Sequence, residues 1–79
     1  MIKVLFFAGL AEQAGQAETE VDFAGRTVKE LTEWAIDTHR LSPDSLNGAM
    51  VAVNEEFASQ STELTAGDVV AFIPPVSGG

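Results

Sequence analysis

The carboxylate at the end of this chain is the group best suited to chemistry. Two glycines, Gly78 and Gly79, end the sequence. Because glycine has no Cβ, this pair can thread a narrow channel and adopt torsions that are closed to other residues. A carboxylate is a poor electrophile, so it must receive a better leaving group before a nucleophile attacks it. Joining it to AMP at the expense of ATP is a common biological way to supply that leaving group.

The segment before the glycines predicts an arm that leaves the body of the protein. It consists of Pro74, Pro75, Val76 and Ser77. Prolines lack an amide hydrogen and have a fixed φ, so they stop a strand from extending its ladder and favour an extended path. We expect residues 74–79 to form a protruding, flexible tail that reaches at most about 20 Å, at roughly 3.3–3.6 Å per residue. A frayed, functionless terminus is the alternative, but it does not explain the prolines, the glycines and the uncharged residues 69–79 together.

Other reactive groups are scarce. The chain has 79 residues and no cysteine, which excludes a thiolate nucleophile, a disulfide and a cysteine metal site. The single histidine, His39, cannot form a multi-histidine cluster, and its place late in a helix predicts a solvated or dipole-stabilised side chain. Glu55 and Glu56 are typical of a solvated turn. We therefore expect no metal site. So short a chain has little room for an enclosed pocket, which disfavours catalysis by this chain alone.

The charge balance restricts the partners. Four Lys and Arg against twelve Asp and Glu give a net charge of -8, which repels nucleic-acid phosphates and anionic lipid heads. The acidic surface serves solubility or steers the chain toward a basic protein, and the uncharged residues 69–77 fit a contact region. The apolar start is too short to span a membrane, and no cleavage site follows it. We expect a soluble cytoplasmic protein with no nucleic-acid or membrane partner.

The elements that must position these groups begin with a strand over residues 2–8. Alternation points Ile2, Val4 and Phe6 inward. The same alternation leaves Leu5 and Phe7 on the face of Lys3, where large apolar groups gain nothing unless something covers them. This face is therefore a possible interface or a second packed layer.

One main helix is predicted from a capping box. Thr27 and Glu30 have the spacing in which each side chain satisfies the amide of the other residue. The helix that begins there carries an apolar stripe whose members are Val28, Leu31, Ala35 and either Trp34 or Thr38. We expect Trp34 to lie in the core or at its edge, and Pro43 to end any continuation of the helix.

The remaining segments predict an α+β domain. Residues 9–15 fit a short helical turn, residues 18–23 a half-buried strand, and residues 49–53 another strand. A tight turn over residues 64–68 leads into an apolar strand, residues 69–73, which is suited to the middle of a sheet. One face of the sheet is then covered by the main helix.

Four segments resemble the family of molybdopterin synthase small subunits. They are MIKVLFFA at the start, AVN at residues 52–54, LTAGD at residues 64–68 and VAFIPPVSGG at residues 70–79. The resemblance spans nearly the whole chain, and its most specific element is the FxPPVxGG ending. It implies one β-grasp, ubiquitin-like domain over residues 1–79, with a mixed sheet and one main helix packed on one face. Residues 9–17 depart most from the family pattern, and their role stays open.

The resemblance also implies a sulfur-transfer cycle. A ubiquitin-activating-type enzyme would use ATP to adenylate the Gly79 carboxylate, and a sulfur donor such as a cysteine desulfurase would supply the sulfur of a thiocarboxylate. The tail, including Gly78, would insert into the large subunit of a heterotetramer of two small and two large subunits. There the sulfur would pass to cyclic pyranopterin monophosphate, and two transfers would build the dithiolene of molybdopterin. This small subunit would donate sulfur and hold no permanent cofactor.

Family positions further imply that Phe7, Phe57 and Ile73 present apolar side chains to partners. For Phe57, a place in the core is the alternative. Three other functions stay open for the chain as a whole. A thiamine-pathway sulfur carrier shares the fold and the Gly-Gly end, although the Pro74-Pro75 pair argues against it. A ubiquitin-like modifier would join Gly79 to lysines, and a plain binding module would carry its glycines by accident.

Overall fold

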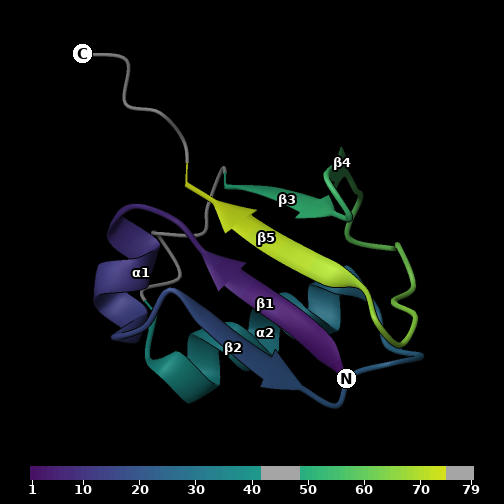
Figure 1. The fold of residues 1–79 in the computed structure, drawn as a ribbon, viewed down its shortest axis with the longest axis horizontal. Coiled ribbons are helices and arrows are strands. Elements are labelled where there is room, and N and C mark those ends of the chain that lie inside the picture. The colour runs from purple at the N-terminus through teal and green to yellow at the C-terminus, as the bar shows by residue number, and fades with distance from the viewer. Residues whose placement is uncertain (42–48, 75–79) are drawn as a thin grey trace.

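The computed structural model describes residues 1–41 and 49–74, and it has the predicted alternation of strands and helices (Figure 1). The elements are β1 (Ile2–Phe6), α1 (Gly9–Ala14), β2 (Glu18–Val21), α2 (Val28–His39), β3 (Met50–Val53), β4 (Glu56–Phe57) and β5 (Val69–Ile73). The predictions for Pro43 and for Pro75, Val76, Ser77, Gly78 and Gly79 lie outside the described residues.

The strands form one mixed sheet in the order β2-β1-β5-β3-β4. β5 is the middle strand, as its uninterrupted apolar sequence predicts. It pairs in parallel with β1, where Lys3 faces Val69 and Phe6 faces Phe72, and it pairs antiparallel with β3. The parallel pair therefore brings the first strand of the chain beside the last one (Figure 1).

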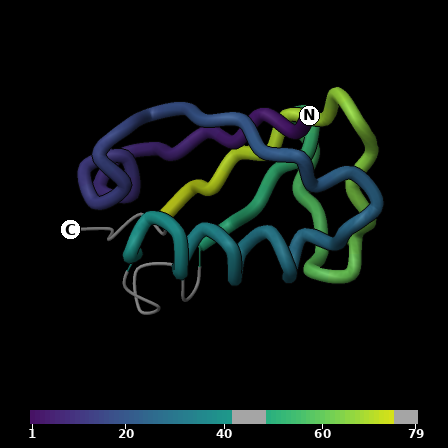
Figure 2. The backbone as a smooth tube through the Cα atoms, turned by 90° about the horizontal axis from the view of Figure 1, so that it is seen from below, coloured from purple at the N-terminus to yellow at the C-terminus, as the bar shows by residue number. Residues whose placement is uncertain are grey.

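α2 lies along one face of this sheet (Figure 2). It begins at the predicted capping box: the Glu30 amide donates to Thr27 Oγ1 at 3.3 Å, and the Thr27 amide donates to Glu30 Oε1 at 3.1 Å. The predicted stripe of Val28, Leu31 and Ala35 is buried. Trp34 is half-buried and packs against the core, so its predicted place at the core edge is confirmed.

The core fills the space between α2 and the sheet. From β1 it takes Ile2, Val4 and Phe6, which confirms their predicted inward direction. The central strand β5 contributes Val70 and Phe72, and the other side chains of the cluster are Leu10, Phe23, Val28, Leu31, Ala35, Leu41 and Leu64. Leu10 belongs to α1, so the short helical turn predicted for residues 9–15 anchors one end of the sheet through a single buried leucine.

His39 differs from its expected environment. Its ring lies edge-on between Phe6, at 5.2 Å between centroids, and Trp34, at 5.3 Å. Its Nε2 atom is buried, with no hydrogen-bond partner among the residues that the structure describes. Of the two predicted alternatives, a solvated side chain is therefore wrong, because the ring faces the end of β1. Dipole stabilisation at the helix end stays a prediction, and His39 does lie in the last turn of α2.

The capping box predicts a measurable share of the stability. Thr27→Ala removes the acceptor for the Glu30 amide, and we expect it to lower the free energy of unfolding by about 1 kcal/mol. Urea unfolding followed by Trp34 fluorescence measures the change. Thr38→Ala, at an exposed position of the same helix, is the matched control, and we expect it to change stability by a few tenths of a kcal/mol. Equal effects of the two substitutions would contradict the capping role.

Candidate functional site

The sheet face opposite α2 is apolar along its centre. Strand register aligns Leu5 of β1 with Ala71 of β5, Ala71 with Ala52 of β3, and Ala52 with Phe57 of β4. Because side chains directly opposite each other on paired strands lie on the same face, these four residues form one row across the sheet. The row runs from a large side chain through two alanines to another large side chain.

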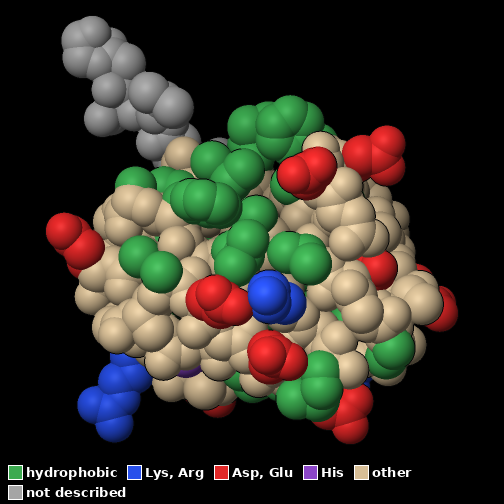
Figure 3. Space-filling view, viewed as in Figure 1, with side chains coloured by type: hydrophobic (Ala, Val, Ile, Leu, Met, Phe, Trp, Pro, Cys, Tyr) green, Lys and Arg blue, Asp and Glu red, His purple; other side chains and the backbone are tan. Residues whose placement is uncertain are grey.

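This arrangement leaves a hollow of about 320 Å³ on the open face. We call it the apolar hollow; it is lined by Leu5, Phe7, Ala52, Glu55, Phe57, Val69, Ala71 and Ile73. The two alanines fill little space between larger neighbours, so they form its floor. Figure 3 shows hydrophobic side chains gathered on the upper part of this face, and a group of one basic and two acidic side chains beside them near the middle of the view.

The three predicted interface residues all line the apolar hollow. Phe57 is 69% exposed and Phe7 is 46% exposed, whereas Ile73 is half-buried. The exposure of Phe57 excludes the alternative that placed it in the core. Large apolar groups that are grouped on one open face are typical of a surface that binds a partner. Their contact with a partner stays a prediction, but their convergence on one hollow is a structural fact.

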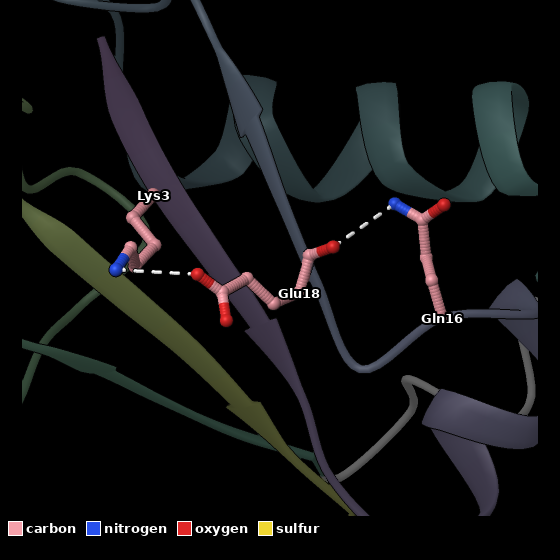
Figure 4. Close-up of polar contacts among 3 residues, drawn as sticks. All are labelled: Lys3, Gln16 and Glu18. Carbon is pink, nitrogen blue, oxygen red and sulfur yellow. Dashed lines mark hydrogen bonds and ion pairs between the residues drawn. The ribbon is translucent and has the colours of Figure 1, made fainter.

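A polar margin bounds the hollow on the side of β2. Lys3 Nζ lies 3.2 Å from Glu18 Oε2, and Gln16 Nε2 donates to the Glu18 carbonyl at 3.2 Å (Figure 4). Both ion-pair partners are about half exposed, and such surface pairs contribute little to stability. Glu20 of β2 lies opposite Lys3 of β1. The apolar surface therefore ends at a group of three charged side chains: Lys3, Glu18 and Glu20. On the opposite side Glu55 adds a carboxylate to the lining.

Sequence patterns missed the floor of this site. Residues 49–53 were predicted as a strand, but nothing within that segment tells which face Ala52 occupies. The facing pair of Ala52 and Ala71 is set by the register between β3 and β5. The tail predicted to do chemistry is described only at Pro74, which directly follows the hollow residue Ile73.

Among residues 1–41 and 49–74, no group of three or more His, Asp or Glu side chains could hold a metal ion. Within the same ranges, neither helix is long and apolar enough to cross a membrane.

Comparison with known sequences gives a match over nearly the entire chain. The profile of the ThiS family matches residues 4–79. The molybdopterin synthase sulfur carrier subunit of Escherichia coli (strain K12) is 43% identical over 81 residues, and the match covers 100% of both chains.

Solved structures share the fold. A candidate subunit 1 of molybdopterin converting factor from Pyrococcus furiosus has a TM-score of 0.80 at 31% identity, over 95% of this chain and 97% of that one. Small archaeal modifier protein 1 from Haloferax volcanii has a TM-score of 0.75 at 28% identity, over 95% and 97%. A complex of subunits 1 and 2 of molybdopterin-converting factor from Helicobacter pylori contains a chain with a TM-score of 0.65 at 24% identity, over 99% and 97%, a likeness in fold alone. The predicted β-grasp, ubiquitin-like fold is confirmed.

Two phenylalanines that lie on opposite faces of the sheet test the exposed character of the site. Phe72→Ala empties a fully buried position, and we expect it to cost about 3–5 kcal/mol of unfolding free energy or to prevent folding. Phe57→Ala removes an exposed ring, and we expect it to cost less than about 1 kcal/mol. Urea unfolding measures both. A large loss for Phe57→Ala would place Phe57 in the core and contradict the open face.

Proposed function

Because this chain belongs to the ThiS family, we propose that it is the sulfur carrier subunit of molybdopterin synthase. The observation that carries the proposal is the 43% identity along the whole chain to the Escherichia coli subunit of that name. The family name by itself leaves the pathway open, so the pathway is assigned from this relative. The Pro74-Pro75 pair before the C-terminal glycines supports the same assignment over a thiamine-pathway carrier.

The proposed chemistry takes place at the Gly79 carboxylate. One carboxylate oxygen attacks the α-phosphate of ATP on an activating enzyme, pyrophosphate leaves, and an acyl-adenylate forms. The outer sulfur of a persulfide supplied through a cysteine desulfurase then attacks the carbonyl carbon, and AMP departs with the original carboxylate oxygen. A thiol cleaves the resulting S–S bond by forming a disulfide with the inner sulfur, and the outer sulfur stays on the Gly79 carbonyl. The product is a thiocarboxylate in which sulfur replaces one oxygen. Because the sulfur is carried on the end of the backbone, the lack of cysteine in this chain is no obstacle.

Docking on the large subunit is assigned to the apolar hollow. Phe7, Phe57 and Ile73 line it, and Ile73 directly precedes Pro74 at the base of the tail. A large subunit seated on the hollow would therefore lie next to the segment that must reach its active site. There the thiocarboxylate would pass its sulfur to cyclic pyranopterin monophosphate, in an assembly of two small and two large subunits. A basic site suited to this phosphorylated substrate would also attract a chain of net charge -8.

A protein-modifier function is the second candidate, because small archaeal modifier protein 1 shares the fold at 28% identity. A modifier would use the same acyl-adenylate but pass its Gly79 carbonyl to a lysine amine, and AMP would leave. The two functions differ in their products: a free thiocarboxylate indicates a carrier, and stable isopeptide adducts indicate a modifier.

Deletion of Gly79 tests the carrier function in cells. Without this residue the chain ends one position short. We therefore expect the terminal carbonyl not to reach the active site of the activating enzyme or that of the large subunit, and molybdoenzyme activity to disappear. Activity is measured in a host that lacks its own carrier, with protein abundance checked by immunoblot. Lys29→Ala, an exposed change on α2, is the control and should leave activity intact. Full activity after the deletion would show that the carrier function is wrong.

Phe7→Ala tests the docking surface. Truncating an aromatic side chain that contacts the partner costs about 1–2 kcal/mol of binding free energy or more, so we expect the Kd for the large subunit to rise about tenfold or more. Calorimetric titration measures the Kd, and urea unfolding of the same variant measures its stability. Unchanged affinity together with a large stability loss would place Phe7 in the core and refute its role in docking.

A further inference from the structure

The turn between β3 and β4 borders the apolar hollow, and both of its residues are exposed. It consists of Asn54 and Glu55, whose φ angles are 51° and 70°. Two residues with positive φ between paired strand ends are typical of a tight type I′ hairpin. β4 follows with only Glu56 and Phe57, both exposed. Glu55 and Phe57 line the hollow, so their position depends on what fixes this turn.

A side-chain pair fixes the turn from outside. Asn54 Nδ2 donates to Asp68 Oδ1 at 2.9 Å, and Asn54 Oδ1 accepts from the Val69 amide at 3.0 Å. The other carboxylate oxygen, Asp68 Oδ2, accepts from the Thr65 amide at 2.8 Å. One amide and one carboxylate thus connect the β3–β4 turn, the turn before β5 and the first residue of β5.

The backbone reinforces the same connection. The Asn54 amide donates to the Val69 carbonyl at 2.8 Å, and the Asp68 amide donates to the Thr65 carbonyl at 3.0 Å. Beyond β4, the Ala58 amide donates to the Val51 carbonyl at 2.9 Å. These bonds pair the strands, but the Asn54 and Asp68 side chains add the cross-connection between the two turns. In these side-chain bonds Asn54 Nδ2 donates to an oxygen, and Asn54 Oδ1, Asp68 Oδ1 and Asp68 Oδ2 each accept from an N–H group.

We propose that Asn54 and Asp68 position the surface of this chain that binds the partner. They hold the β3–β4 hairpin so that Phe57 lies at the rim of the apolar hollow. Phe57 cannot be held there by its own burial, because its ring is mostly exposed. A rim aromatic binds well only when it is already held in its bound position, since ordering it on association costs affinity. The inference rests on the proposed function, because it takes the large subunit as the partner.

The pair can be tested by exchanging its two side chains. In Asn54→Asp/Asp68→Asn, the new carboxylate at position 54 accepts from the Val69 amide and from the new amide at position 68. The new amide oxygen at position 68 accepts from the Thr65 amide, so every side-chain bond is restored and the net charge is unchanged. Aspartate also tolerates the left-handed backbone of position 54. Asn54→Asp alone places two carboxylates face to face, and Asp68→Asn alone directs an amide N–H at the Thr65 amide or at Asn54 Nδ2.

Two measurements test the positioning role on four proteins, which are the original chain, the two single variants and the exchanged double variant. Hydrogen exchange of the Ala58 amide reports on the hairpin without any partner, and titration with the large subunit gives the Kd. We expect each single variant to exchange faster at Ala58 and to bind about fivefold to tenfold more weakly, and the exchanged double variant to return within about twofold of the original protein in both. Asn54→Gly, which keeps the backbone freedom but loses the side chain, replaces Asn54→Asp if that variant does not fold.

A double-mutant cycle separates positioning from a general contribution to stability. In a Phe57→Ala background the hairpin no longer carries the aromatic ring, so we expect Asn54→Asp to change the Kd less than about twofold. The proposal is overturned if all variants bind equally, if Ala58 exchange does not change in the single variants, if the exchanged double variant stays weak, or if the loss persists without Phe57. Failure of the original protein to bind the large subunit would instead refute the proposed function, and Ala58 exchange would still test the positioning of the hairpin.

Discussion

The parallel pairing of β1 with β5 is the interaction on which the rest of the structure depends. It places Val70 and Phe72 beside the inward side chains of β1, and these residues form the centre of the core under α2. By the same alternation it sends Leu5, Val69 and Ala71 to the other face. Within residues 1–41 and 49–74, one long helix covers one face of the five-stranded sheet, and these residues leave the second apolar face open. The core and the apolar hollow are therefore two consequences of one strand pair.

An apolar face that stays exposed to water is unfavourable for a protein that acts alone, but it favours association in a protein that binds a partner. Small alanines form the floor, large side chains form the rim, and carboxylates lie at the margins. The last described residue, Pro74, directly follows a residue that lines the hollow. In the proposed function, docking on the large subunit would both cover the apolar face and bring the tail to the reacting centre.

Local patterns predicted much of this architecture. Alternation in β1 predicted both the buried residues and the outward pair of Leu5 and Phe7, and the Thr27–Glu30 spacing predicted the start of α2. Features set by distant contacts were not predictable. The ring of His39 packs against Phe6 of β1, Ala52 reaches the hollow through strand register, and Asn54 bonds to a residue 14 positions away. None of these partners lies within the reach of a helical or strand period, so only the folded chain shows them.

Intact mass spectrometry of the protein purified from its native host tests the central claim most directly. The sulfur carrier function requires that sulfur replace one oxygen of the Gly79 carboxylate. It therefore predicts a species heavier than the unmodified chain by roughly 16 Da, the difference between sulfur and oxygen, which disappears on hydrolysis of the thiocarboxylate. A population that contains only the unmodified chain and stable lysine-linked adducts would contradict the account and favour a protein modifier.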